Sequence, residues 1–429
     1  MISQGQFMVT SPVLNDRVSD LRVLLSSMNS APGQVDPMNT RVPFARFENI
    51  HFARFVVADD QTLGDRAAFS GLPANERILL IFLADCDGPG DELMARMATE
   101  AGQGLREVFS HCDGFDAGTD LLAWMQARQT PPSAFYVNWI GRTVRQVREE
   151  AALHDALHRE LHGGASGVSR DTAQSLHQHL RAATVGNGTR LTPIEPMTLR
   201  QWIGKVGLIV LLALLALVLL IPLIIIAPFF FIALRYHEKT DPVIDTRADS
   251  VYVSAIAKGE DHDVTNSFSA IGSLKPGGLR LLITQVALWG VGQTAVLIFN
   301  RGRLARVSTI HFARWVLLDG NRRVFFASNY DGSLESYMDD FINKVAFGLN
   351  LVFSNGIAYP PTDYLVLRGA WQEQMFKQFL HRHQLKTDVW YKAYPGLTNA
   401  DLARNARIRQ GLESTTLSDG AIRRWLAEI

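Results

Sequence analysis

The sequence contains little cysteine and no net charge, and each absence excludes a class of protein. Cys86 and Cys112 are the only cysteines among 429 residues, too few for the disulfide framework of a small secreted protein, so we expect two ordinary buried thiols. Lysine and arginine together number 42, as do aspartate and glutamate. This balance gives no electrostatic argument for a nucleic-acid partner, and we expect none.

Familiar catalytic and targeting motifs are also missing. The sequence has no Walker loop, no nucleophile elbow and no dinucleotide-binding glycine pattern in the right context. The first residues, MISQGQFMVTSPVLNDR, have neither a basic region nor an apolar core, so we expect no signal peptide. His154, His158 and His162 recur at four-residue spacing without the glutamate of a zinc protease, and we expect a solvated helix face there rather than a metal site.

What the sequence does have is one very hydrophobic stretch. Residues 206–234 read VGLIVLLALLALVLLIPLIIIAPFFFIAL, without a charged or hydrogen-bonding side chain. About 20 apolar residues already cross the hydrocarbon core of a bilayer. Trp202 and Lys205 precede the stretch and Arg235 and Tyr236 follow it, and such residues favour the headgroup region. The sequence therefore predicts membrane insertion, with the lipid bilayer as partner.

A second apolar stretch, residues 281–299, is interrupted by two threonines and two glutamines. Arg280, Arg301, Arg303 and Arg306 lie at its ends. Basic flanks suit the headgroup layer, so we expect this stretch to lie in or on the membrane, the alternative being a buried helix of a soluble domain.

Two nearly identical hexapeptides, IHFARF at 50–55 and IHFARW at 310–315, lie on opposite sides of the hydrophobic stretch. Each precedes a strand-like segment, an Asp-Gly corner (84–88 and 328–332) and a helical pattern. The order β-β-α-β-α in both halves predicts an α+β fold with antiparallel sheets covered by helices. Each half leaves one apolar sheet face exposed, so we expect the two halves to pack together.

An arginine and an aspartate recur in each half: Arg54 with Asp87, and Arg314 with Asp331. We expect each arginine to pair with the aspartate at the end of the neighbouring strand and to fix the corner before the helix. The alternative is that the second pair lies beside a ligand pocket.

The repeated pattern resembles the dimeric α+β barrel superfamily, in which two ferredoxin-like sheets pack face to face and which includes the dye-decolourising peroxidases. The segments IHFARW, SNYDGS and YMDDFINK are also similar to uncharacterised bacterial membrane-associated proteins. The peroxidase resemblance implies Asp331 as the residue that handles peroxide over haem, Arg314 as its partner and His311 as the haem-binding candidate. The first glycine of that family's G-x-x-D-G motif is absent here.

These patterns divide the chain into eight parts. They are a polar N-terminal lead (1–40), a first ferredoxin-like repeat (41–165), a linker (166–199), a membrane-embedded segment (200–239), a connector (240–280), an interfacial or membrane helix (281–306), a second ferredoxin-like repeat (307–396) and a C-terminal tail (397–429). The predicted fold class is α+β: two half-barrels packed as an intramolecular α+β barrel, plus an α-helical membrane anchor.

Two functions compete on this basis. The first is a membrane-anchored binding or scaffold protein that holds an apolar small molecule, a lipid or a protein partner. The second is a haem-dependent peroxidase-like enzyme at the membrane surface. If the repeats pack together, both lie on one side of the membrane. We expect a hairpin bending near Pro222 and Pro228, or a kinked helical pair, embedded in the inner membrane with both halves in the cytoplasm. The other solution is a crossing that returns through residues 281–299. The sequence leaves the oligomeric state open.

Overall fold

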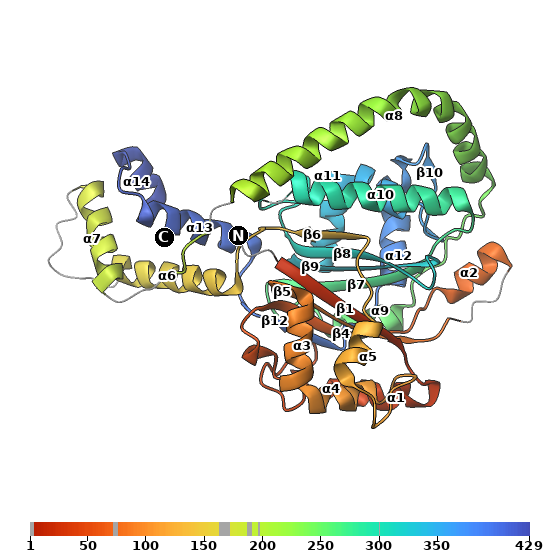
Figure 1. Ribbon diagram of the computed structural model, residues 1–429, viewed down its shortest axis with the longest axis horizontal. Coiled ribbons are helices and arrows are strands. Elements are labelled where there is room, and N and C mark those ends of the chain that lie inside the picture. The colour runs from red at the N-terminus through yellow and green to blue at the C-terminus, as the bar shows by residue number, and fades with distance from the viewer. Residues whose placement is uncertain (1–3, 72–75, 163–171, 187–190, 196–197, 300) are drawn as a thin grey trace.

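Two four-stranded antiparallel sheets face each other at the centre of the molecule (Figure 1). The computed structural model describes residues 4–71, 76–162, 172–186, 191–195, 198–299 and 301–429. The strands of the first sheet, in spatial order, are β1 (Gln4–Pro12), β5 (Leu79–Asp87), β4 (Ile50–Ala58) and β12 (Val389–Lys392). Those of the second are β6 (Ala134–Val137), β8 (Ile310–Leu318), β9 (Arg323–Asp331) and β7 (Thr265–Ser273). The predicted mixture of helices with antiparallel sheets is confirmed.

Each sheet is completed by a strand from the other half of the chain. β12 pairs with β4, although more than 300 residues separate them, and β6 pairs with β8 across the long hydrophobic stretch. The two pairings have the same register: Tyr391 lies opposite Ala53 as Tyr136 lies opposite Ala313. The two halves are therefore interlocked, and neither sheet is complete without the other half.

The faces of the sheets that meet form a shared apolar core. Val56 and Ile81 of the first sheet pack with Val316 and Phe325 of the second, and all four are buried. These side chains alternate along their strands with residues that face the covering helices, as the two-residue period of a strand requires.

Helices cover the outer face of each sheet (Figure 1). On the first sheet they are α1 (Val18–Ser26), α3 (Gly90–Glu100), α4 (Gly102–Phe109) and α5 (Leu121–Ala127). On the second they are α10 (Gly278–Leu297), α11 (Leu334–Phe353) and α12 (Glu373–His383). A separate apolar cluster joins α6 (Val144–His162), α7 (Ala173–Gly186), α13 (Asn399–Glu413) and α14 (Asp419–Leu426). Two further short helices are α2 (Leu63–Ser70) and α9 (Ser250–Ala257).

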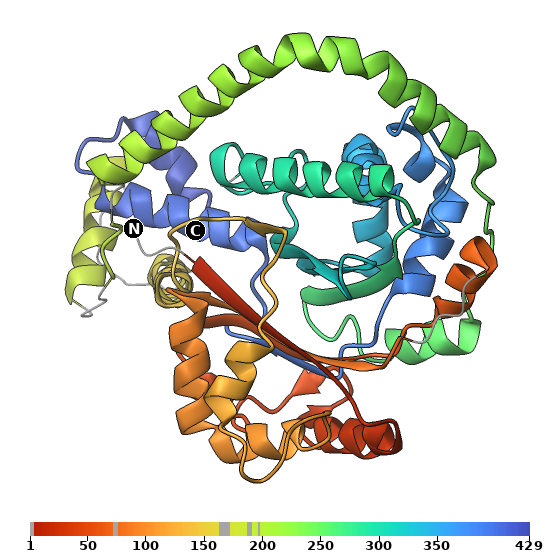
Figure 2. The ribbon, with the colours of Figure 1, turned by 45° about the vertical axis from the view of Figure 1, so that its right-hand side comes forward.

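The hydrophobic stretch forms one continuous helix, α8 (Leu199–Thr240), with Pro222 and Pro228 inside it. It begins with a capping box, in which Thr198 and Gln201 satisfy each other's backbone N–H groups. Among the described residues it is the one helix long and apolar enough to cross a membrane. Figure 2 shows α8 bent into an arch over α10, and the bend agrees with the missing backbone hydrogen bonds at the two prolines. The prolines therefore bend the helix without ending it, so α8 is one kinked helix and not two separate arms joined by a turn.

Two predicted boundaries are wrong. The polar lead contains β1, and the connector contains β7. Both strands lie at sheet edges and are rich in Gln, Ser, Thr and Gly, so they lack the alternation that identifies half-buried strands. With these strands included, each half has the order β-α-β-β-α-β-α.

The third strand that the order β-β-α-β-α predicts for the second half, at TDYLVLRG (362–369), does not belong to either central sheet. Residues 362–368 form only the two-residue strands β10 (Thr362–Asp363) and β11 (Leu367–Arg368), outside both central sheets. The counterpart of β6 is β12, and the helix that corresponds to α6 is α13. The C-terminal tail packs against the rest of the protein, with α13 on α6 and α14 on α7.

Candidate functional site

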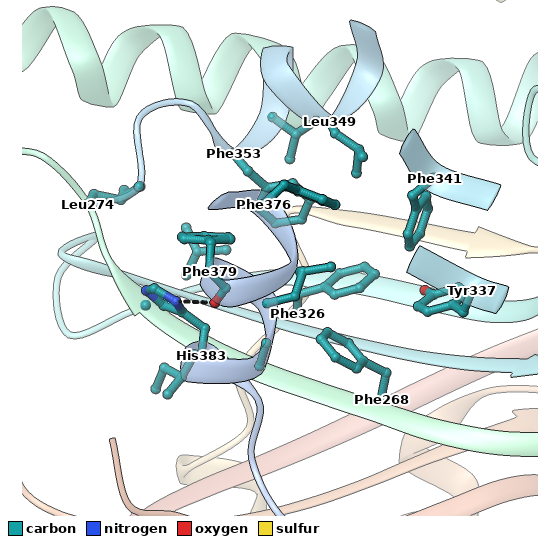
Figure 3. Close-up of a pocket in the computed structure, with 17 residues that line it drawn as sticks. Phe268, Leu274, Phe326, Tyr337, Phe341, Leu349, Phe353, Phe376, Phe379 and His383 are labelled. Carbon is teal, nitrogen blue, oxygen red and sulfur yellow. Dashed lines mark hydrogen bonds between the residues drawn. The ribbon is translucent and has the colours of Figure 1, made fainter. Parts of the chain in front are cut away.

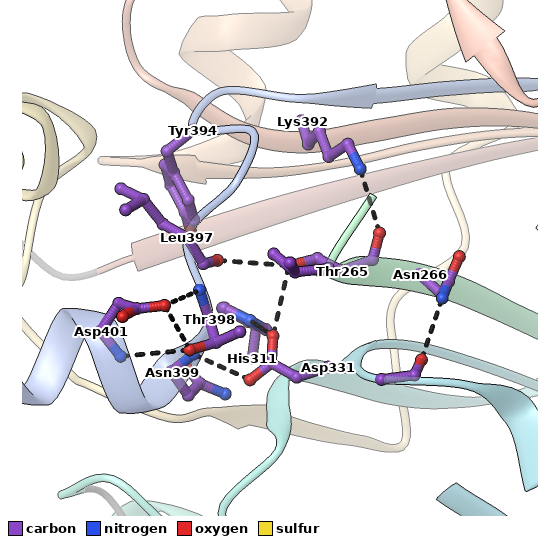
Figure 4. A network of polar contacts seen from close by, with 12 residues as sticks. Thr265, Asn266, His311, Asp331, Lys392, Tyr394, Leu397, Thr398, Asn399 and Asp401 are labelled. Carbon is purple, nitrogen blue, oxygen red and sulfur yellow. Dashed lines mark hydrogen bonds and ion pairs between the residues drawn. The ribbon is translucent and has the colours of Figure 1, made fainter. Parts of the chain in front are cut away.

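A buried polar cluster lies at one end of the two sheets, where the predicted site residues are found. His311 Nε2 is 2.7 Å from Asp331 Oδ1, and the other carboxylate oxygen accepts a hydrogen bond from the backbone N–H of Asn399 at 2.8 Å. Asn399 is the first residue of α13, so the carboxylate fills the positive N-terminus of that helix (Figure 4). Asp331 thus joins β9 to α13.

The first half has the same arrangement. His51 Nε2 is 2.9 Å from Asp87 Oδ1, and Asp87 Oδ2 accepts from the backbone N–H of Val144 at the start of α6. The two histidines come from equivalent strand positions, each at a shift in register between β4 and β5 or between β8 and β9. The carboxylates at the Asp-Gly corners are therefore bound by histidine and by helix N-termini.

A tyrosine links the two copies. Tyr394 lies just beyond β12, and its hydroxyl is 3.1 Å from His51 Nδ1, while its ring is 6.2 Å from that of His311 (Figure 4). Burial raises the pKa of Tyr394 well above its usual value. The hydroxyl therefore stays protonated and acts as a hydrogen-bonding group of the cluster.

The cluster does not fit a haem group. The cavity lined by His51, His311 and Tyr394 has a volume of about 20 Å³, room for roughly one water molecule. A site for a drug-sized ligand needs roughly 300–1,000 Å³. The His311 side chain is 2% exposed and its Nε2 is already bound to Asp331. No haem chemistry is assigned to His311 on this geometry.

The predicted pairing of Arg314 with Asp331 is wrong, as is that of Arg54 with Asp87. Arg314 lies opposite Ala327, and the four residues from there to Asp331 cover about 13 Å along the strand, beyond the reach of the guanidinium. Arg314 instead crosses to the first sheet, where it donates to the carbonyl of Phe7 at 2.9 Å and pairs with Asp85.

Arg54 makes the reciprocal contacts with the second sheet. It donates to the carbonyl of Phe268 at 2.9 Å, the position that corresponds to Phe7, and to the side chain of Asn329, the position that corresponds to Asp85. Asn329 in turn donates to Asp85 at 3.1 Å. These four residues (Arg54, Asn329, Asp85 and Arg314) form what we call the cross-sheet cluster.

The cross-sheet cluster contains two guanidinium groups and one carboxylate, all buried. Burial lowers the pKa of Arg54 to about 9, against the opposing effect of Asp85. The arginines of the two IHFAR segments therefore hold the two sheets together through buried hydrogen bonds and an ion pair.

An apolar cavity of about 50 Å³ lies inside the second half, between the sheet and helices α11 and α12 (Figure 3). Phe326, Tyr337, Phe376 and Phe379 line it, and His383 closes one side with Nδ1 2.7 Å from the carbonyl of Phe379. The cavity is too small for a lipid chain. It adjoins a larger space through the α11 side chains Phe341, Leu349, Val352 and Phe353, which line both.

The larger space is a groove of about 960 Å³ between α8, α10 and α11. We call it the α8 groove. Leu223, Ile226 and Phe230 of α8 form one wall, and the opposite wall comes from α10 and α11, including Val286, Gly290, Phe347 and Gly348. Nearly every lining side chain is apolar.

The few polar groups in the α8 groove are already satisfied. The Thr294 hydroxyl donates to the carbonyl of Gly290 within its own helix at 3.0 Å, as threonines in apolar helices often do. Lys344 pairs with Asp340 at 2.6 Å. The groove therefore offers its occupant an apolar surface.

Sequence reasoning found the two hydrophobic stretches but not the groove between them. Its floor includes Gly290 and Gly348, where a Cβ atom would meet nothing within 4 Å. A glycine inside an apolar helix is the available signal, because it leaves open space on that face.

His154, His158 and His162 lie along α6, with ring centroids 6.1 and 4.2 Å apart. No group of three possible metal ligands occurs in the part of the chain that the structure describes.

Comparisons of this chain with protein-family models, with curated proteins and with solved structures find no match.

Proposed function

We propose that this protein is a membrane-attached binding protein that holds the acyl chain of a lipid, or a similarly apolar molecule, in the α8 groove. The observation that carries the proposal is a groove of about 960 Å³ whose walls are apolar and one of whose walls is itself a candidate membrane helix. A volume of this size lies within the range of small-molecule sites.

The proposal includes membrane attachment through α8. Leu234 is its one buried residue, and large apolar side chains such as Leu217, Ile221 and Phe229 are mostly exposed on all sides of the helix. A helix that is hydrophobic all round needs an apolar solvent. The exposed faces of Val286 and Trp289 on α10 extend the same apolar surface.

We further propose that α8 enters the bilayer and returns without separating the two halves. The exchange of β6 and β12 supports this topology, because a single crossing would put the strands of each pair on opposite sides. Both ends of α8 are also tied to the same body: residues 191–193 bind α6 and α13, and Glu238 accepts hydrogen bonds from the backbone of Tyr364 and Leu365.

In this proposal the body is an intramolecular α+β barrel of two ferredoxin-like halves, on the cytoplasmic side of the inner membrane. The order β-α-β-β-α-β in each half and the two facing sheets support the first part. Basic residues at both ends of the membrane segment, such as Lys205 and Lys239, support the second, since they favour the cytoplasmic face.

Filling the α8 groove tests the proposal. Gly290→Phe together with Gly348→Phe places two rings in the groove without a backbone clash. If the rings displace two buried methylenes of a bound chain, at about 0.8 kcal/mol each, binding weakens roughly tenfold. Native mass spectrometry of the full chain, purified in a neutral detergent, measures the lipid retained.

The matched control is Gly64→Phe, a helical glycine on α2 with nothing within 4 Å of its Cβ. We expect the control to retain as much lipid as the unmodified protein and the double variant to lose most of it. A protein that copurifies without lipid and takes up none on titration, or a double variant that binds lipid normally, would contradict the proposed function.

A further inference from the structure

The end of the α8 groove nearest the C-terminus of α10 carries positive charge. Arg301, Arg303 and Arg306 follow α10 in sequence and are exposed, and with Ile298, Phe299 and Ala305 they line a hollow of about 490 Å³. We propose that the occupant of the groove is an anionic phospholipid, whose phosphate binds these three arginines while an acyl chain lies in the groove. This inference rests on the proposed function.

The hollow adjoins the groove, because Phe299 and Ala305 line both spaces. A molecule that spans the two would meet the arginines at one end and the apolar walls of α10 and α11 at the other. A molecule with a charged headgroup and an apolar chain matches the basic hollow and the apolar groove together. A free anion would contact only the arginines of the hollow, and a neutral apolar molecule would contact only the groove.

The segment that carries the arginines is held in place by its backbone. The N–H of Gly302 donates to the carbonyl of Asn138 at 2.9 Å, and Leu304 and Val307 exchange two backbone hydrogen bonds at 2.8 and 2.9 Å. Val307 is fully buried. The guanidinium groups are therefore presented from a fixed turn at the mouth of the groove.

The charges of the three arginines are not neutralised within the described residues, where none of these side chains makes an ion pair or hydrogen bond. Many arginines elsewhere in the described chain are paired, for example Arg41 with Glu107 at 2.9 Å and Arg235 with Asp363 at 2.8 Å. Among the described residues that line the hollow there is no carboxylate. Guanidinium groups bind phosphate oxygens with paired hydrogen bonds, so a phosphate is the ligand that this site favours.

The position also suits a headgroup. α10 exposes Leu282, Val286, Trp289 and Val296, side chains that favour the apolar part of a bilayer, and the arginines lie just beyond its last turn. Basic side chains beside an inserted apolar surface lie at the depth of lipid phosphates.

The test titrates the full chain in neutral detergent with phosphatidylglycerol and with phosphatidylcholine of the same acyl chains, and counts bound lipid by native mass spectrometry. We expect phosphatidylglycerol to bind about tenfold more tightly or better, since each of several arginines near a lipid surface contributes to binding an anionic headgroup. Replacing Arg301, Arg303 and Arg306 by Gln should remove this preference and leave phosphatidylcholine binding unchanged.

The control replaces Arg17, Arg423 and Arg424 by Gln, three exposed arginines outside the groove, and should keep the preference. Equal affinity for the two lipids, or a preference that survives the triple change at the groove, would overturn the headgroup site while leaving the groove itself intact. Displacement of phosphatidylglycerol by millimolar inorganic phosphate would assign the arginines to a free anion instead. If neither lipid binds the unmodified protein, it is the proposed function that fails.

Discussion

At the scale of single residues, the cross-sheet cluster explains why the same hexapeptide occurs twice. Arg54 and Arg314 each reach the main-chain carbonyls of equivalent positions in the opposite half, Phe268 and Phe7. Each arginine thereby satisfies backbone groups of a sheet it does not belong to. The cluster contains a single carboxylate, Asp85, between two buried cations.

Replacing Asp85 by Asn should therefore lower the free energy of unfolding strongly. The change leaves two guanidinium groups in a dry interior without a negative partner, and removing one partner of a buried pair costs about 3–5 kcal/mol of unfolding free energy. Asp87→Asn is the comparison two residues away: it keeps one acceptor oxygen for His51 or Val144, and we expect a cost of about 1–3 kcal/mol. Chemical denaturation measures both.

If Asp85→Asn lowers the free energy of unfolding less than Asp87→Asn does, Asp85 does not stabilise the two buried arginines as described. The sequence pointed to Arg54 and Arg314 but paired them with Asp87 and Asp331 of their own halves, and it did not point to Asp85. It could not do otherwise, since the true partners of Arg54 and Arg314 belong to the opposite sheet. Only the packing of the two sheets brings Asp85 and Asn329 to them.

At the scale of elements, the exchange of β12 depends on a buried acid at its start. Asp388 precedes β12, and its carboxylate accepts a hydrogen bond from the backbone N–H of Val57 at 2.8 Å, while its own N–H donates to the carbonyl of Phe55 at 3.0 Å. Burial raises the pKa of Asp388 to about 6. The exchanged strand is thus attached to β4 through a group that ionises just below neutral pH.

This raised pKa gives a pH dependence of definite sign. Between about pH 4 and pH 6 the folded state binds a proton that the unfolded state has lost, so the stability due to Asp388 falls as the pH rises, by about 3 kcal/mol in all. An asparagine at position 388 cannot ionise. The free energy of unfolding of Asp388→Asn, relative to that of the unmodified protein, should therefore rise by about 3 kcal/mol between pH 4 and pH 7. Chemical denaturation of both proteins at the two pH values measures this difference.

Asp20→Asn, the loss of an exposed carboxylate on α1, is the control for the change in charge. If the difference in free energy of unfolding between the Asp388→Asn and unmodified proteins stays constant across this pH range, Asp388 does not cause the pH dependence.

The elements also show where sequence reading succeeds. β4, β5, β8 and β9 have strong apolar and β-branched composition and were correctly predicted, as was the helical character of residues 206–234. The edge strands β1 and β7 were missed because their sequences are polar. The pairing of β12 with β4 is a contact between residues far apart in the chain, and no local pattern encodes it.

At the scale of the whole molecule, the two exchanged strands and the arch of α8 together limit how the chain can be arranged around a membrane. The halves on either side of α8 are interlocked through β6 and β12, and α8 leaves the body and returns to it as an arch (Figure 2). In the proposed topology this arch enters the membrane and returns on the same side. The α8 groove lies between that helix and the body, and the proposed insertion of α8 would give lipid chains access to it. The binding proposal and the topology therefore depend on each other.

Sidedness of the two halves tests this account most directly. Cys86 and Cys112 are buried, and burial raises the pKa of both thiols to about 12, so they react poorly with labels. Ala117→Cys in the first half and Ser336→Cys in the second each introduce one exposed thiol. A membrane-impermeant maleimide applied to sealed vesicles of known orientation should label both positions from the cytoplasmic side and neither from the other. Labelling of the two positions from opposite sides would contradict the account, because the strands of each exchanged pair would then be separated by the bilayer.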